Sequence, residues 1–143
     1  MATLEVNNKQ LRLIQQALDL YSRIGAGQFN VIKEHPTFER YLANVLKDDE
    51  CKTDYDEYHK VRSSVDKMLV QPRNMLMQEP NHPQNGSWGI YNKKVDESCR
   101  EAFDIIQVIR HEFWKERETR SSMTVDSSIH FTSNDSDNIK VTL

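Results

Sequence analysis

The sequence has few of the features that mark secreted, membrane or nucleic-acid-binding proteins. It contains two cysteines, Cys51 and Cys99, and its start, Met1-Ala-Thr-Leu-Glu, lacks the basic and apolar parts of a secretion signal. We therefore expect two buried thiols in a cytoplasmic protein rather than a disulfide. No apolar run approaches the ~18 residues of a membrane span. The net charge of −3, from 19 Lys and Arg against 22 Asp and Glu, disfavours binding to DNA.

The motifs of common enzymes are also missing. Gly25 and Gly27 have the spacing of two glycines of a dinucleotide loop, but the third glycine is absent. His111-Glu112 begins like the helix of a zinc protease, but Lys115 stands where the second histidine would be. The histidines share no ligand spacing, and there is no nucleophile elbow. These absences favour a protein without metal, cofactor, or standard hydrolase or dehydrogenase chemistry.

Hydrophobic spacing predicts a single domain over 1–143 with about four helices. They are expected over 9–33, from 36 to about 46, over 54–70 and over 95–116. Asn7 and Asn8 offer a cap for the first helix, and Pro36 suits the start of the second. Pro72 is expected to end the third helix, with a short helical turn following over 74–78.

Two glycines fall inside the first predicted helix. Gly25 and Gly27 would each cost about 1 kcal/mol there relative to alanine. Either the helix ends at this point, or another backbone or a ligand comes close. Because apolar residues continue within 29–32, we favour a kinked or closely packed continuation to Lys33.

The last predicted helix carries two stripes. The first recurs at spacings of four and three, as in the apolar seam of a helix packed on another element. It consists of Val95, Cys99, Ala102, Ile106, Ile109 and Phe113. The second stripe consists of Phe103, Gln107, Arg110 and Trp114. Arg110 has no acid three or four places away, so a structural partner would have to come from elsewhere in the chain.

Residues 118–143 are predicted to form a β-rich segment. β-Branched residues gather at 123–125, 129–132 and 139–143, and a polar turn lies at 134–138. Together with Thr3–Val6 these pieces are expected to form a small sheet, and the alternative is a disordered tail. The predicted fold class is therefore α+β, with about four helices packed with a small antiparallel sheet.

The remaining chemistry is that of recognition. Trp88, Tyr91 and Asn92 lie in a glycine-containing loop before a helix N-terminus, which offers rings, an amide and backbone N–H groups to a ligand. Three arginines are candidates to bind phosphate: Arg62, Arg110 and Arg120. The alternative is that Trp88 and Tyr91 pin the loop to the core and that Phe103 and Trp114 are core residues.

Five segments, in order, carry a resemblance that covers most of the chain. They are Asn8-Lys-Gln-Leu-Arg-Leu-Ile-Gln-Gln-Ala-Leu-Asp-Leu-Tyr21, Gly27-Gln-Phe29, Gly86-Ser-Trp-Gly-Ile-Tyr-Asn92, the helix with Val108-Ile-Arg-His111, and Met123-Thr-Val-Asp126. The chain resembles the first Thoeris anti-defence family, phage sponge proteins that sequester a cyclic ADP-ribose-type signal. None of the segments is a catalytic motif, and their order and the chain length carry the match.

The resemblance implies a non-enzymatic role in the host cytoplasm. The signal, a cyclic ADP-ribose isomer made from NAD by a bacterial TIR-domain enzyme, would be bound and left intact. The resemblance also implies a homohexamer and, for some members of the family, binding of cyclic oligonucleotides. The implied pocket residues are Arg62, Trp88, Tyr91, Asn92, Arg110, Arg120 and Asp126.

Two further hypotheses concern the glycine turn and the function itself. Arg23, Gly25 and Gly27 are hypothesised to line a symmetric interface and a second ligand site there. The alternatives to a sponge are an enzyme that cleaves nucleotides, with Asp126 or Glu112 as acid or base, and a protein–protein adaptor that uses the apolar seam.

Overall fold

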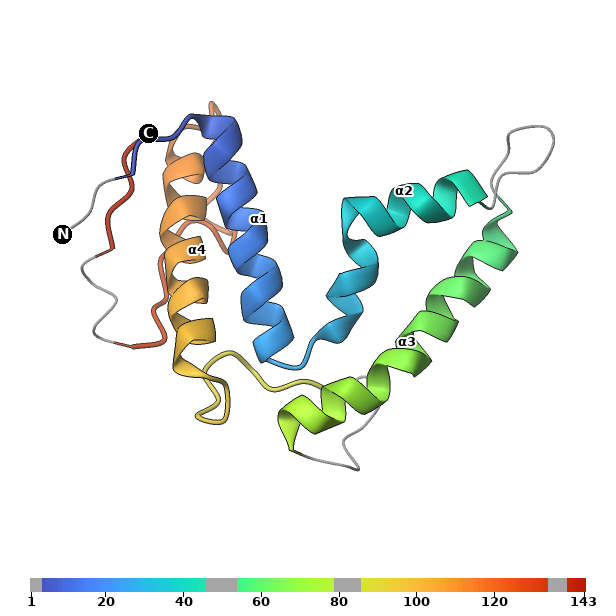
Figure 1. Ribbon diagram of the computed structural model, residues 1–143. Coiled ribbons are helices and arrows are strands. Elements are labelled where there is room, and N and C mark those ends of the chain that lie inside the picture. The colour runs from blue at the N-terminus through green and yellow to red at the C-terminus, as the bar shows by residue number, and fades with distance from the viewer. Residues whose placement is uncertain (1–3, 46–53, 79–85, 134–138) are drawn as a thin grey trace. The chain divides into compact units, whose positions relative to one another are not determined.

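The computed structural model describes residues 4–45, 54–78, 86–133 and 139–143, and the expectations for Thr3, Cys51 and the turn at 134–138 lie outside them. Within these ranges the helices are α1 (Asn8–Gly25), η1 (Phe29–Glu34, a 3-10 helix), α2 (Pro36–Val45), α3 (Tyr55–Met77) and α4 (Glu97–Lys115) (Figure 1). None of them is long and apolar enough to cross a membrane. The chain forms two compact units, and the single domain over 1–143 stays a prediction. The first unit is Met1–Gly25 with Gly89–Leu143, and the second is Ala26–Trp88.

In the first unit α1 and α4 lie side by side and antiparallel (Figure 1). The predicted cap of α1 is confirmed: the side chains of Asn7 and Gln10 each accept a hydrogen bond from the other's backbone N–H at 2.9 Å. Asp96 caps α4 by accepting from the backbone N–H of Ser98 at 2.9 Å. A hydrogen bond from the Ser98 hydroxyl, together with this backbone one, lowers the pKa of the Asp96 carboxyl.

The predicted seam of α4 is confirmed. All six of its residues, from Val95 to Phe113, are buried, and Ile109 and Phe113 form a core cluster with Leu11 of α1. Gly25 lets the end of α1 approach α4 closely, because a Cβ atom there would lie 2.1 Å from the sulfur of Cys99. Cys99 is a buried free thiol, as expected.

The predicted antiparallel sheet, and with it the α+β class and the β-rich segment at 118–143, is wrong, because the regular structure of the described residues consists of helices and includes no strand. Residues 116–133, which we call the C-terminal strap, have no regular structure. Hydrogen bonds with side chains of α4, rather than with a neighbouring strand, hold the strap in place. Asp104, which is fully buried, accepts from the backbone N–H (2.8 Å) and hydroxyl (2.9 Å) of Thr132. Because side chains of α4 bond to backbone groups of the strap, the β-branched residues of this segment need no neighbouring strand.

The first helix ends at Gly25, and the second unit begins with a turn at residues 26–27 instead of a continued helix. Gly27 has a left-handed φ of 79°, and a Cβ atom there would lie 2.4 Å from the sulfur of Met77. The favoured helical continuation to Lys33 is therefore wrong, although the close packing is confirmed. The 3-10 helix η1 follows, and it contacts both α2 and α3.

The prediction that Pro72 ends the third helix is also wrong. α3 runs through Pro72 to Met77 as one helix, capped at its start by Asp54, which accepts from the backbone N–H of Glu57 at 3.0 Å. Proline removes one backbone hydrogen bond and costs about 3 kcal/mol inside a helix. Here Arg73 and Met77, both beyond Pro72, are buried, so packing of the last turns outweighs that cost.

Candidate functional site

Two arginines converge on one carboxylate at the surface of the first unit. Arg110, on α4, binds Oδ1 of Asp126 through Nε (2.8 Å) and Nη2 (2.7 Å). Arg117, just past the end of α4, donates from Nη2 to Oδ2 of Asp126 at 3.0 Å. We call these three residues the arginine–aspartate cluster. The structural partner that Arg110 lacks on its own helix is thus Asp126, on the C-terminal strap.

Two stacked rings lie beside this cluster. The rings of His111 and Trp114 are 5.4 Å apart between centroids and 19° from parallel. His111 Nδ1 lies 3.0 Å from the backbone oxygen of Asp126, and Trp114 Nε1 donates to that of Ser121 at 3.1 Å. Both rings therefore hold the strap, and His111 does so at Asp126, the residue that the two arginines bind. Planar rings next to guanidinium groups are what binding of bases and phosphates requires.

The loop before α4 supplies Tyr91 and Asn92. The exposed Tyr91 ring packs edge-on against Phe103 with centroids 6.3 Å apart, and its hydroxyl lies 3.5 Å from the backbone oxygen of His130. The side-chain oxygen of Asn92 accepts from the backbone N–H of Lys94 at 3.0 Å. Both residues thus have local structural contacts, and both remain at the surface of the first unit.

Arg62 and Trp88 belong to the second unit. Arg62 forms an ion pair with Glu39 of α2 and bonds to the Tyr58 hydroxyl at 2.9 Å. Tyr58 also donates to Glu39 at 2.5 Å. That hydrogen bond is the main reason why the pKa of Glu39 lies below its ordinary value and that of Tyr58 above. The backbone N–H of Trp88 donates to the oxygen of Ala26 at 2.9 Å, so it fastens the loop to the turn after α1.

The other predicted residues have mixed surroundings. Arg120 is exposed and forms no ion pair with any residue that the structure describes. Arg23 pairs with Asp19 on its own helix at 2.9 Å. Gly25 and Gly27 are each explained by a close contact within their own unit, with Cys99 and Met77 respectively.

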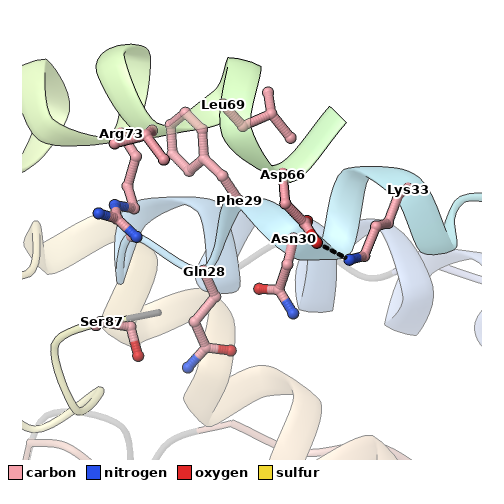
Figure 2. A pocket seen from close by; sticks show the side chains of 11 residues that line it. Gln28, Phe29, Asn30, Lys33, Asp66, Leu69, Arg73 and Ser87 are labelled. Carbon is pink, nitrogen blue, oxygen red and sulfur yellow. Dashed lines mark hydrogen bonds and ion pairs between the residues drawn. The ribbon is translucent and has the colours of Figure 1, made fainter. Parts of the chain in front are cut away.

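A pocket of about 240 Å³ lies between η1 and α3 in the second unit. Its wall contains one aromatic ring, Phe29, and three charged side chains, Lys33, Asp66 and Arg73 (Figure 2). Lys33 forms an ion pair with Asp66, and Arg73 is 4% exposed and bonds to the side-chain oxygen of Asn74. Of the predicted site residues only Gly27 lines this pocket.

The structure thus brings Arg110 together with Asp126, and it places Arg62 in a different unit, bound to its own partners. The sequence prediction missed Arg117, although its position seven residues after Arg110 was a usable signal. It also missed Arg73, because a helix expected to end before Pro72 hides that Asp66 and Arg73 share one face of α3. Among the residues described, no group of three or more His, Cys, Asp and Glu side chains is placed to hold a metal ion.

Comparison of the chain with known protein families, with characterised proteins and with solved structures finds no match.

Proposed function

We propose that the protein binds and sequesters a nucleotide signal of the cyclic ADP-ribose type without cleaving it. In this proposal it is a phage counter-defence protein that acts in the host cytoplasm against the product of a bacterial TIR-domain enzyme. The support is of two kinds: the sequence resemblance, and the convergence of Arg110 and Arg117 on Asp126.

The arginine–aspartate cluster is the observation that carries the proposal. A carboxylate and a phosphate present similar pairs of oxygens to a guanidinium group. Two cations and one carboxylate leave the cluster with a net positive charge, so a phosphate of the ligand can replace Asp126 on both arginines. Asp126 then positions Arg110 and Arg117 before the ligand arrives. The stacked rings of His111 and Trp114 offer a flat surface to a base beside that phosphate.

The geometry gives less support to the alternatives. An acid or base for cleavage would be Asp126 or Glu112, but Asp126 is held by two arginines and Glu112 is paired with Lys115 at 2.5 Å. An adaptor that uses the Val95–Phe113 seam would need that seam exposed, and it is buried in the first unit.

The homohexamer and the second site for cyclic oligonucleotides at Arg23, Gly25 and Gly27 remain part of the proposal. Because Gly27 packs against Met77, a large residue at position 27 would disturb the fold whatever the oligomeric state of the protein. Light scattering on the unaltered protein is therefore the better test of assembly.

The test is calorimetry with the cyclic ADP-ribose isomer, followed by heat denaturation and chromatography of the released ligand. Stoichiometric capture of a signal needs roughly nanomolar affinity, or about −12 kcal/mol. We expect the ligand to be recovered intact, and Arg110→Ala to weaken binding by at least tenfold, or about 1.5 kcal/mol for a charged hydrogen bond. Arg100→Ala, on the same helix, is the matched control. Recovery of a cleaved product, or no binding at micromolar ligand, would refute the proposal.

A further inference from the structure

The pocket between η1 and α3 combines an apolar wall with polar side chains that have no hydrogen-bond partner among the described residues. Phe29, Leu69 and Val70 supply the apolar part. Gln28, Asn30 and Ser87 supply amides and a hydroxyl. The side chains of these three form no hydrogen bond within the ranges that the structure describes.

The polar ends of the wall come together. In Figure 2 the guanidinium group of Arg73 and the ends of Gln28 and Ser87 turn toward the same space, while Asn30 lies between them and the Lys33–Asp66 pair. The donors and acceptors come from three separate pieces of the chain, residues 28–33, α3 and residues 86–87, so only the folded unit assembles them.

The charge of the wall favours a small anion. Lys33 and Arg73 against Asp66 give the lining residues a net charge of +1. Asp66 binds Lys33 through Oδ2, while its Oδ1 is buried and has no partner among the residues described. An unsatisfied buried acceptor is costly, and a small rotation of this carboxylate would let it accept from a ligand hydroxyl. The wall therefore suits a ligand with both a negative charge and hydroxyl groups.

The size narrows the ligand further. Pockets for drug-sized molecules measure about 300–1,000 Å³, and this one, at about 240 Å³, is smaller. We propose that it binds a pentose phosphate group, as in a nucleoside monophosphate. The phosphate lies at Arg73, the sugar hydroxyls at Asp66 and the amides of Gln28 and Asn30, and the sugar packs on Phe29. The site lies in the second unit, shares no residue with the arginine–aspartate cluster, and does not depend on the proposed function.

The test uses ribose 5-phosphate and AMP as probes, and calorimetry and NMR of the full chain measure their binding. We expect saturable binding of both below about 1 mM, and at least tenfold weaker binding of ribose, adenosine and inorganic phosphate. Asn30→Asp places a carboxylate in the wall at an exposed position, and it should weaken AMP binding about tenfold. Ser63→Asp, also exposed and on α3 but outside this pocket, makes the same change of charge and should have no effect.

Two further variants separate this site from the first. Arg110→Ala should leave AMP binding unchanged, while Gln28→Leu should weaken it without affecting the cyclic nucleotide. The proposal is overturned if neither probe binds saturably, if adenosine or inorganic phosphate binds as tightly as AMP, or if Asn30→Asp and Ser63→Asp have the same effect. Loss of AMP binding in Arg110→Ala would also overturn it, because the phosphate would then lie at the first cluster.

Discussion

Replacing Asp126 by asparagine should change stability and ligand affinity in opposite directions. The side chain is 13% exposed, and it accepts from Arg110, which is 30% exposed, and from Arg117, which is 49% exposed. Asp126→Asn keeps the shape and removes the charge. A hydrogen bond to a charged group is worth about 1.5–3 kcal/mol when buried, whereas exposed ion pairs contribute about 0–1 kcal/mol. Because the Arg117 contact is exposed and counts for less, we expect the free energy of unfolding to fall by about 2 kcal/mol.

That loss should lower the melting temperature by roughly 6 °C for a chain of this length. Affinity should rise, because the phosphate no longer competes with a carboxylate for the two guanidinium groups. We expect about tenfold tighter binding of the cyclic nucleotide, equivalent to about 1.4 kcal/mol. Differential scanning fluorimetry and calorimetry measure the two effects on the same samples.

Glu57→Gln is the control, because Glu57 pairs with Lys60 at 3.4 Å on an exposed face of α3. This substitution should change the melting temperature by no more than about 2 °C and should leave the affinity for the nucleotide unchanged. If Asp126→Asn weakens nucleotide binding, the displacement argument is wrong, because Asp126 then either contacts the ligand directly, as the sequence predicted, or is needed to hold the two arginines in place. An unchanged melting temperature would show that the cluster contributes nothing to the fold.

Three further predictions concern the fold. Gly25→Ala should destabilise the protein by at least about 2 kcal/mol by overpacking, since its Cβ would lie 2.1 Å from the sulfur of Cys99. Cys99→Ala in the same chain should recover part of the melting temperature. Asp104→Ala should cost about 2–3 kcal/mol and expose the C-terminal strap to limited proteolysis, read by mass spectrometry. The pKa of Glu39 is lowered mainly by the hydrogen bond from Tyr58. Ionised Glu39 therefore stabilises the fold above the ordinary pKa of 4.5, and this stabilisation is lost as pH falls through the lower pKa of the folded state. The melting temperatures of Glu39→Gln and wild type should therefore differ at pH 6 and converge as pH falls below the lowered pKa of Glu39.

The helices were predictable where the apolar period was long. The seam from Val95 to Phe113 repeats over five turns, and the structure buries every member of it. The end of α3 was not predictable, because Pro72 acts locally while the burial of Met77 depends on the turn that contains Gly27. Local preference was outweighed there by a contact between residues fifty positions apart in the sequence.

The site was predictable only in part, for a related reason. Arg110 was predictable because it is an arginine on a half-buried stripe with no acid nearby on its own helix, and the structure places it in the cluster, bound to Asp126. Its partner Asp126 follows sixteen residues later in a segment without periodicity, so no spacing rule connects the two. The same segment was mistaken for strands, because its β-branched residues were visible in the sequence and the anchoring side chains of α4 were not.

Anchoring by side chains also bears on how the C-terminal strap would respond to a ligand. In a sheet, residues around Asp126 could not move without breaking a ladder of backbone bonds. Here the strap is held at separate points: Asp126 by two arginines, Ser121 by Trp114, and Thr132 by the buried Asp104. A phosphate that takes both arginines would release the first point and leave the last in place. Hydrogen exchange should then rise near Asp126 on ligand binding while Thr132 stays protected, whereas Asp104→Ala should expose Thr132 without any ligand.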